Sequence, residues 1–149
     1  MSLDGVYDPD NIFARIVRGE LPSAKVFEDA DTFAFMDAFP QALGHTLVVH
    51  KRSHARNLLE ASPEDLAAVI ATVRRVALAV RSAVKPDALA VMQFNGAVSG
   101  QTIYHLHFHI IPRWEGVALG KHAGGMADPG ELAGQASMIA AAIADQAAA

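Results

Sequence analysis

The sequence predicts an α+β fold, in which a β-sheet packs against helices that are set apart from the strands along the chain. Two observations predict it. Short runs rich in β-branched residues group on either side of one long amphipathic segment, and an alanine-rich segment of helical character lies near the C-terminus. Strands that group together, with helices segregated from them, are typical of α+β folds and not of alternating βαβ folds.

Five short runs rich in β-branched and aromatic residues predict the strands. We place them at residues 24–28, 32–37, 45–50, 89–94 and 104–111. Turn and loop residues separate them, for example Asp29-Ala30-Asp31 between the first two strands and the glycine-containing segment 95–100 before the last.

Three segments have apolar residues at helical spacing. A short helix begins at Asp10 or Asn11, either of which can cap it. The longest begins at Ser62-Pro63-Glu64-Asp65, with serine as the cap and proline at the first helical position, and Pro86 stops it. This helix is about 33 Å long, enough to cross a small sheet. Asp128-Pro129-Gly130-Glu131 begins the last helix.

Composition limits the class of protein. The chain has 149 residues and 15.8 kDa, the size of one domain. Its net charge of −4 argues against non-specific binding of nucleic acid, which needs a positive field. No stretch approaches about 20 consecutive apolar residues, so we expect no membrane span. The first ten residues lack the basic and apolar regions of a secretory signal, and we therefore expect a cytoplasmic protein.

The predicted strand 104–111 alternates three histidines with three apolar residues. Because side chains alternate between the faces of a strand, one face carries His105, His107 and His109, about 6.6–7 Å apart. The opposite face carries Leu106, Phe108 and Ile110, which is an ordinary core pattern. Histidine is the side chain best suited to exchange protons near neutral pH, so this row predicts a catalytic site.

Two other interpretations of the row were weighed. The positions can be outward-facing polar sites that happen to be histidine, although three in strict alternation argue against this. Alternate histidines on a strand can also chelate Zn²⁺ or iron, but such sites usually take a further carboxylate or thiolate. The neighbouring residues supply none and the chain has no cysteine, so we expect no metal and no cofactor.

Residues 105–111 resemble the signature of the histidine-triad (HIT) superfamily, His-φ-His-φ-His-φ-φ, where φ is hydrophobic. Further segments are similar to blocks of its Hint branch, in the same order: 11–17, 35–37, 44–49, 95–96 and 100–102. The resemblance implies an antiparallel sheet of about five strands with the long helix packed across it, and a sheet extended across a homodimer. It divides the chain into an N-terminal extension (1–9), a HIT domain (10–114) and a C-terminal tail with a helix (115–149).

The resemblance also implies catalytic roles. His107 matches the nucleophile that attacks the α-phosphorus of a nucleotide and becomes a nucleotidyl-histidine intermediate. His105 and His109 match the flanking histidines that orient it and contact the phosphate, and His45 matches a fourth histidine of the cluster. A neutral imidazole suits attack on an anionic phosphate, provided that an acceptor such as a backbone carbonyl holds its other nitrogen.

The nucleotide-binding positions follow in the same way. Asp37 matches the acid that binds ribose hydroxyls. The residues that match the apolar walls of the base pocket are Phe13, Ile16 and Leu21. The residues that match the donors on the phosphate side are Asn95, Gly100, Gln101 and Thr102. From the residues alone, the apolar set is equally consistent with plain core, and Asn95-Gly96 is a common turn dipeptide.

The implied function is hydrolysis of nucleoside phosphoramidates or related nucleotidyl adducts, with a purine nucleoside monophosphate or its adducts as ligand. A dinucleoside polyphosphate hydrolase and a non-catalytic nucleotide-binding module are the alternatives. Some relatives hold structural zinc through a Cys-x-x-Cys motif at the first helix. Here Asn11 and Ala14 occupy the two cysteine positions, so we expect no zinc site of that kind. Arg113 and Trp114 can contact either ligand or partner. His54 and His122 are expected at the surface, and His50, where the family often has proline, can point to solvent.

Overall fold

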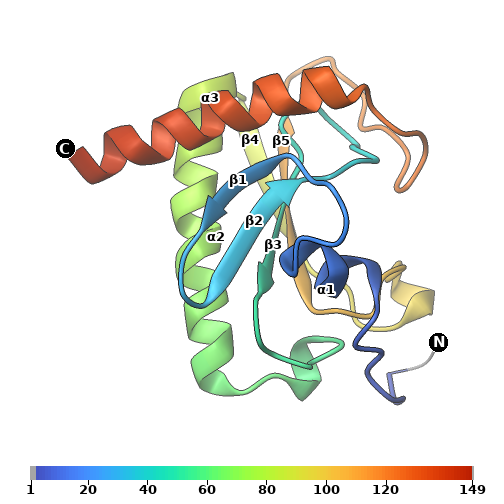
Figure 1. Ribbon diagram of the computed structural model, residues 1–149. Helices are drawn as coiled ribbons and strands as arrows, with labels where there is room; N and C mark the ends of the chain where they lie inside the picture. The colour runs from blue at the N-terminus through green and yellow to red at the C-terminus, as the bar shows by residue number, and fades with distance from the viewer. Residues whose placement is uncertain (1–2, 149) are drawn as a thin grey trace.

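Five strands form one antiparallel sheet in the computed structural model, which describes residues 3–148 (Figure 1). The strand order is β1-β2-β3-β5-β4, and every neighbouring pair is antiparallel. The strands are β1 (Lys25–Glu28), β2 (Thr32–Met36), β3 (Thr46–His50), β4 (Ala88–Met92) and β5 (His107–Arg113). The predicted α+β class and the antiparallel sheet of about five strands are confirmed.

Three α-helices and two short 3₁₀ helices complete the described part of the chain. They are α1 (Ile12–Val17), η1 (Leu58–Glu60), α2 (Pro63–Val84), η2 (Ala97–Ser99) and α3 (Pro129–Ala148). Within residues 3–148, none of these helices is both long enough and apolar enough to cross a membrane.

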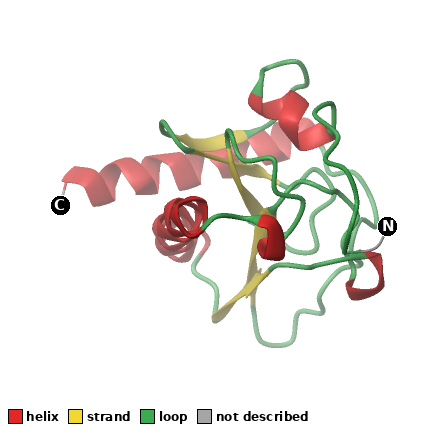
Figure 2. Cartoon of the chain, turned by 90° about the horizontal axis from the view of Figure 1, so that it is seen from below, coloured by secondary structure: helices red, strands yellow, loops and turns green. Residues whose placement is uncertain are grey.

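Helix α2 begins and ends where the capping residues predict. The Ser62 hydroxyl accepts a hydrogen bond from the Asp65 N–H at 3.1 Å, and Pro63 occupies the first turn. Lys85 closes the helix in the left-handed conformation, at φ 50°, just before Pro86. Figure 2, in which α2 is seen end-on, shows the helix on one side of the sheet and the loop segments on the other.

The main core lies between the sheet and the two long helices. Val69, Val76 and Val80 of α2 are fully buried there against residues of the central strands. The three apolar residues predicted for the inner face of the histidine strand, Leu106, Phe108 and Ile110, lie in the same cluster. Helix α3 crosses α2 and adds Leu132 and Ile139, so the C-terminal tail contributes to the main core (Figure 1).

A second, smaller cluster covers part of the opposite face of the sheet, beneath α1. It consists of Phe13, Phe33, Phe35, Leu47 and Val49. Leu47 pairs with His109 and Val49 with His107, so these two histidines lie on the same face as this cluster. The sheet therefore separates a conventional core on one side from the histidines on the other.

Strand β5 begins at His107, three residues later than predicted, and it continues to Arg113. The Leu106 N–H donates to the Ala55 carbonyl at 3.0 Å, while the His50 carbonyl accepts from the His105 ring at 3.3 Å. These bonds take the place of the backbone hydrogen bonds to β3 that would continue the strand. Strand β4 likewise ends at Met92 instead of residue 94, because the Gln93 side chain bonds Asn95 and turns the chain.

Candidate active site

A cavity of about 550 Å³ opens beside the histidine strand, a size typical of small-molecule sites. Helix α1, the ends of β2 and β5, and the segment before α3 enclose it. Its lining includes Ile12, Phe13, Ile16, Phe35, Asp37, Leu47, Thr102, Ile103, His107, His109, His122 and Met126. Apolar side chains dominate this list, and its polar members are Asp37, Thr102, His107, His109 and His122.

His107 is held in one tautomer by the backbone. Its Nδ1–H donates to the His105 carbonyl at 2.7 Å, so the Nε2 atom carries the lone pair. The side chain is 7% exposed, and burial lowers its pKa to about 4, so the ring is neutral near pH 7. Nothing in residues 3–148 hydrogen bonds to Nε2. His107 therefore presents an uncharged nitrogen nucleophile to the cavity.

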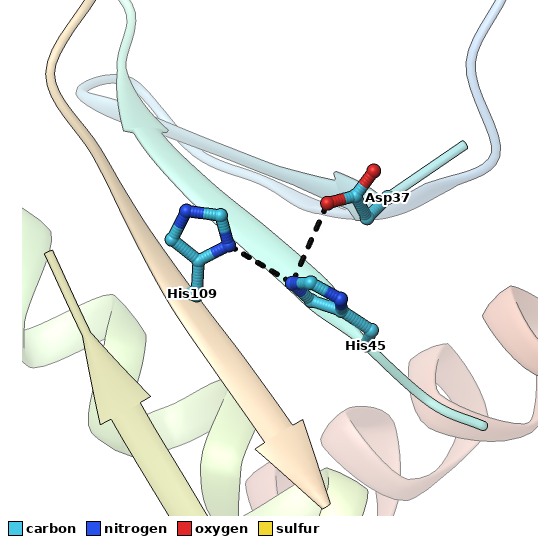
Figure 3. A group of neighbouring side chains, drawn as sticks. All are labelled: Asp37, His45 and His109. Carbon is cyan, nitrogen blue, oxygen red and sulfur yellow. Dashed lines mark hydrogen bonds and ion pairs between the residues drawn. The ribbon is translucent and has the colours of Figure 1, made fainter. Parts of the chain in front are cut away.

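A chain of hydrogen bonds sets the tautomers of His45 and His109. The Gln41 backbone N–H donates to His45 Nδ1 at 3.0 Å, so the proton of neutral His45 sits on Nε2. That Nε2–H lies 2.9 Å from His109 Nδ1, which must accept (Figure 3). The proton of His109 is consequently on Nε2, which is buried and has no partner among the described residues. His109 thus offers an unused N–H donor beside His107, at 4.9 Å between ring centroids.

Burial keeps this pair of rings uncharged. It lowers the pKa of His45 to about 4 and that of His109 to about 3, with the neighbouring imidazoles acting in the same direction. Burial also raises the pKa of Asp37, whose Oδ2 lies 3.4 Å from His45 Nε2. Because His45 is neutral and its Nε2–H is donated to His109, this contact is a close approach of the carboxyl group and not an ion pair.

Asp37, His45 and His109 bring three possible metal ligand atoms within 4.8 Å of one another. A histidine that binds a metal normally donates its other ring N–H to an acceptor. His45 does the reverse, because its Nδ1 accepts from the Gln41 N–H. Coordination through Nε2 would require a doubly deprotonated ring or two donors facing each other. The arrangement fits a hydrogen-bonded relay better than a metal centre.

His105 takes a supporting position. Its Nδ1 accepts from the Tyr7 hydroxyl at 2.9 Å and from the Asn11 amide at 3.3 Å, and its Nε2–H points to the His50 carbonyl. Burial lowers its pKa to about 4. It does not line the cavity, and its carbonyl is what holds His107. Tyr7, from the N-terminal extension, carried no signal in the sequence that would reveal this contact.

The predicted base-pocket residues divide into two groups. Phe13 and Ile16 line the cavity. The rings of Phe13 and His107 pack edge to face, with 4.8 Å between their centroids. Asp37 and Thr102 also line it. Leu21 does not; it lies in a separate, shallower hollow with Gly19 and Phe33. Leu21 follows α1, and the chain turns away from the cavity there.

The remaining phosphate-side candidates brace a loop outside the cavity lining. Gln101 is 4% exposed and bonds the Gly96 N–H and the Arg56 carbonyl, at 2.9 and 2.7 Å. Asn95 accepts from the Leu58 N–H at 2.9 Å. Gly100 ends η2 at φ 115°, a conformation that favours glycine. Together these residues fix the segment that precedes Thr102, which lines the cavity.

The other histidines take different positions. His50 does not point to solvent, because it is 3% exposed: its Nδ1 accepts the N–H groups of Arg52 and Ser53, and its Nε2 lies 3.1 Å from Asp65. His122 is exposed as expected, yet it lines the cavity, 5.8 Å from His109 between ring centroids.

His54 is exposed and stacks on Tyr7. Of the two residues expected to contact ligand or partner, Trp114 donates its indole N–H to the Lys85 carbonyl at 3.2 Å, at the end of α2. Arg113 ends β5, where its backbone carbonyl accepts from the Asp87 N–H at 2.9 Å.

Comparison with known proteins supports the same grouping. The HIT domain family matches residues 18–116. The Protein hit of Bacillus subtilis is 40% identical over 69% of this chain and 70% of its own, and the adenosine 5′-monophosphoramidase hnt1 of Schizosaccharomyces pombe is 39% identical over 68% and 73%. The crystal structure of a Hit-like protein from Bartonella henselae superimposes with a TM-score of 0.88 at 50% identity, covering 93% of this chain and 99% of that one. The chain belongs to the histidine-triad (HIT) family.

Proposed function

We propose that the protein hydrolyses nucleoside phosphoramidates or related nucleotidyl adducts, through a nucleotidyl intermediate on His107. One observation carries the proposal: the His107 Nδ1–H is bonded to the His105 carbonyl at 2.7 Å, and this leaves the Nε2 lone pair for the cavity. The similarity to a named adenosine 5′-monophosphoramidase favours phosphoramidates as the substrate class.

In the first step, His107 Nε2 attacks the α-phosphorus and the bond from phosphorus to the leaving nitrogen breaks. That nitrogen takes a proton from water at the open side of the cavity and departs as a neutral amine. The His109 Nε2–H, free of other partners, donates to a phosphoryl oxygen as charge develops on it. The new cationic adduct keeps its Nδ1–H on the His105 carbonyl.

In the second step, a water molecule attacks the phosphorus and gives a proton to the hydroxide that the first step left behind. The bond to Nε2 breaks, which restores the lone pair and releases a nucleoside monophosphate. One water is consumed overall. Phe13 and Ile16 form the apolar wall that we assign to the base, and Asp37 is the acceptor that we assign to the ribose hydroxyls. Thr102, at the rim, is assigned to the phosphate side.

The test compares His107→Ala with the wild type on adenosine 5′-phosphoramidate. We expect kcat/KM to fall by about 10⁴-fold or more, because removal of a nucleophile leaves only binding and donor effects. Arg74→Gln, at an exposed position of α2, is the matched control and should retain full activity. Mass spectrometry of wild-type protein that is quenched in alkaline denaturant, in which the bond between phosphorus and histidine is stable, should locate a nucleotidyl group on His107.

Three outcomes would contradict the proposal, the first two in whole and the third in its substrate class. Equal rates for His107→Ala and the wild type would refute the nucleophile. Tight binding of AMP without turnover of any phosphoramidate would indicate a nucleotide-binding module. Faster turnover of a dinucleoside polyphosphate than of the phosphoramidate would shift the substrate class and keep the nucleophile.

We also propose that two copies associate, since the family resemblance implies a sheet extended across a homodimer, and we assign the pairing to β4. Strand β4 is an edge of the sheet, and Val91 on it is 50% exposed. Unpaired edges are usually covered or paired in folded proteins. Sedimentation velocity should give the mass of a dimer for the wild type and of a monomer for Val91→Lys; a monomeric wild type would refute the pairing.

A further inference from the structure

The His105 carbonyl, which holds the Nδ1–H of His107, comes from the segment just before β5 and not from the paired strand. The pairing of β5 with β3 ends at His107, opposite Val49, so the peptide unit between His105 and Leu106 lies outside it. The Leu106 N–H anchors one side of this unit, by donating to the Ala55 carbonyl at 3.0 Å. Because a planar peptide unit can tilt about a single hydrogen bond, a second anchor is needed to fix where the His105 carbonyl points.

The ring of His105 supplies that second anchor, and its two nitrogens have fixed roles. On one side Nε2 lies 3.3 Å from the His50 carbonyl, which can only accept. On the other side the Asn11 amide nitrogen, which can only donate, lies 3.3 Å from Nδ1. The orientation of the Asn11 amide is settled, because its oxygen accepts from the Ala14 N–H and its nitrogen donates to the Asp8 carbonyl. The proton of the neutral His105 ring is therefore on Nε2, and Nδ1 is an acceptor.

Tyr7 makes the shortest of the three hydrogen bonds to this ring. Its hydroxyl lies 2.9 Å from His105 Nδ1, and because that nitrogen accepts, the hydroxyl donates. Burial raises the pKa of Tyr7, so the proton that this bond needs stays on the hydroxyl. The two rings are also neighbours, with 5.8 Å between their centroids. The donor that holds His105 most closely thus comes from the N-terminal extension, 98 residues away in the chain.

The N-terminal extension is itself held near Tyr7. The Leu3 carbonyl accepts from the Arg56 guanidinium at 2.6 Å and from the Asn57 amide at 3.3 Å. The Tyr7 ring stacks on His54, with 4.6 Å between the centroids and 7° between the planes. These contacts limit the movement of the Tyr7 hydroxyl relative to the ring that it bonds.

We propose that Tyr7 is a positioning residue: through its bond to the His105 ring it fixes the His105 carbonyl, which keeps the Nε2 lone pair of His107 directed into the cavity. This inference rests on the proposed function and adds to it a residue from outside the cavity. Tyr7 does not line the cavity, so its removal should slow the chemical step and leave substrate binding unchanged. The cationic adduct on His107 depends on the same carbonyl for its Nδ1–H, so the need for this anchor increases as the reaction proceeds.

The experiment compares Tyr7→Phe with the wild type and with Tyr104→Phe. Tyr7→Phe removes the hydroxyl and keeps the ring that stacks on His54. Tyr104→Phe is the matched control, because it makes the same change at the other tyrosine of the chain, whose hydroxyl bonds the Gln101 carbonyl at 3.4 Å. Two quantities are measured: the single-turnover rate on adenosine 5′-phosphoramidate, and the NMR signal of the His107 Nδ1–H, which is assigned by its loss in His107→Ala.

In Tyr7→Phe we expect the single-turnover rate at saturating substrate to fall about tenfold, the factor that corresponds to one lost hydrogen bond. The substrate concentration that gives half of this rate should change by less than about twofold. The His107 Nδ1–H signal should move and should exchange faster with solvent, because its acceptor is less firmly held. Tyr104→Phe should match the wild type in all three. A purely structural role of Tyr7 would lower the free energy of unfolding without moving this signal.

A wild-type rate in Tyr7→Phe, or an unmoved His107 signal, would overturn the inference. A loss of activity that appears only as weaker binding of the substrate would overturn it as well. If the wild type binds AMP but turns over no phosphoramidate, the proposed function fails, and the NMR comparison of Tyr7→Phe with the wild type still decides whether Tyr7 positions His107.

Discussion

Lowering the pH from about 7.5 to about 5 should destabilise the protein through its buried histidines. His45, His105, His107 and His109 are each at most 7% exposed, and burial lowers the pKa of each, to about 4 for the first three and about 3 for His109. In the unfolded chain these imidazoles protonate near the ordinary value of 6.5. The unfolded state therefore binds protons first as the pH falls, so the stability is complete above 6.5 and is lost between 6.5 and about 4.

The size of the effect follows from linkage. A histidine with a pKa of 6.5 unfolded and about 4 folded loses about 2 kcal/mol of folding free energy at about pH 5. Four such groups acting independently would lose about 8 kcal/mol, comparable with the whole stability of a typical domain. The four rings are neighbours, and charge on one opposes charge on the next, so cooperative acid unfolding is the expected form of the transition.

Urea unfolding followed by circular dichroism at about pH 7.5, 6 and 5 measures the loss directly. His45→Phe removes one of the four imidazoles and should shrink the difference between pH 7.5 and 5 by about 2 kcal/mol, even though the variant is less stable overall. His54→Gln, at an exposed position, should follow the wild type. A free energy of unfolding that stays constant down to pH 5, or NMR titration of these four rings near 6.5, would refute the reasoning.

Three substitutions test other parts of the structure. Lys85→Gly should raise the free energy of unfolding by about 1 kcal/mol, because Lys85 ends α2 at φ 50° and glycine adopts that conformation without penalty; an unchanged urea midpoint would contradict this. Ser62→Ala should lower it by about 1 kcal/mol through loss of the cap to Asp65, whereas Ser62→Asp should retain most of it. Gly120→Ala should lower the free energy of unfolding by about 1 kcal/mol, because a Cβ there would lie 2.9 Å from the Gln41 carbonyl oxygen and disturb the hydrogen bonds between the two residues; an unchanged urea midpoint would contradict this.

Local patterns predicted several features correctly. The alternation from Leu106 to Ile110 placed the apolar residues in the main core, because strand geometry alone decides which side chains share a face. The Ser62-Pro63 pair predicted where α2 begins, since helix caps depend on neighbouring residues only. The expected backbone acceptor for His107 was also found, in the His105 carbonyl two residues away.

The remaining features depend on segments far apart in the chain. The proton position of His109 follows from a bond between residues 64 apart, and the burial of His50 depends on packing against the start of α2 near Asp65. Gln101 was expected at the phosphate and instead braces a loop through Arg56.

The sequence by itself determined which residue types can act as nucleophile and donors, and on which face of the sheet they lie, because these properties are set within a few residues. Only the tertiary structure decided which ring nitrogen of His109 carries its proton and that His122 joins the cavity. Both depend on where the distant His45 ring or a packed C-terminal segment comes to rest, and no local pattern encodes that position.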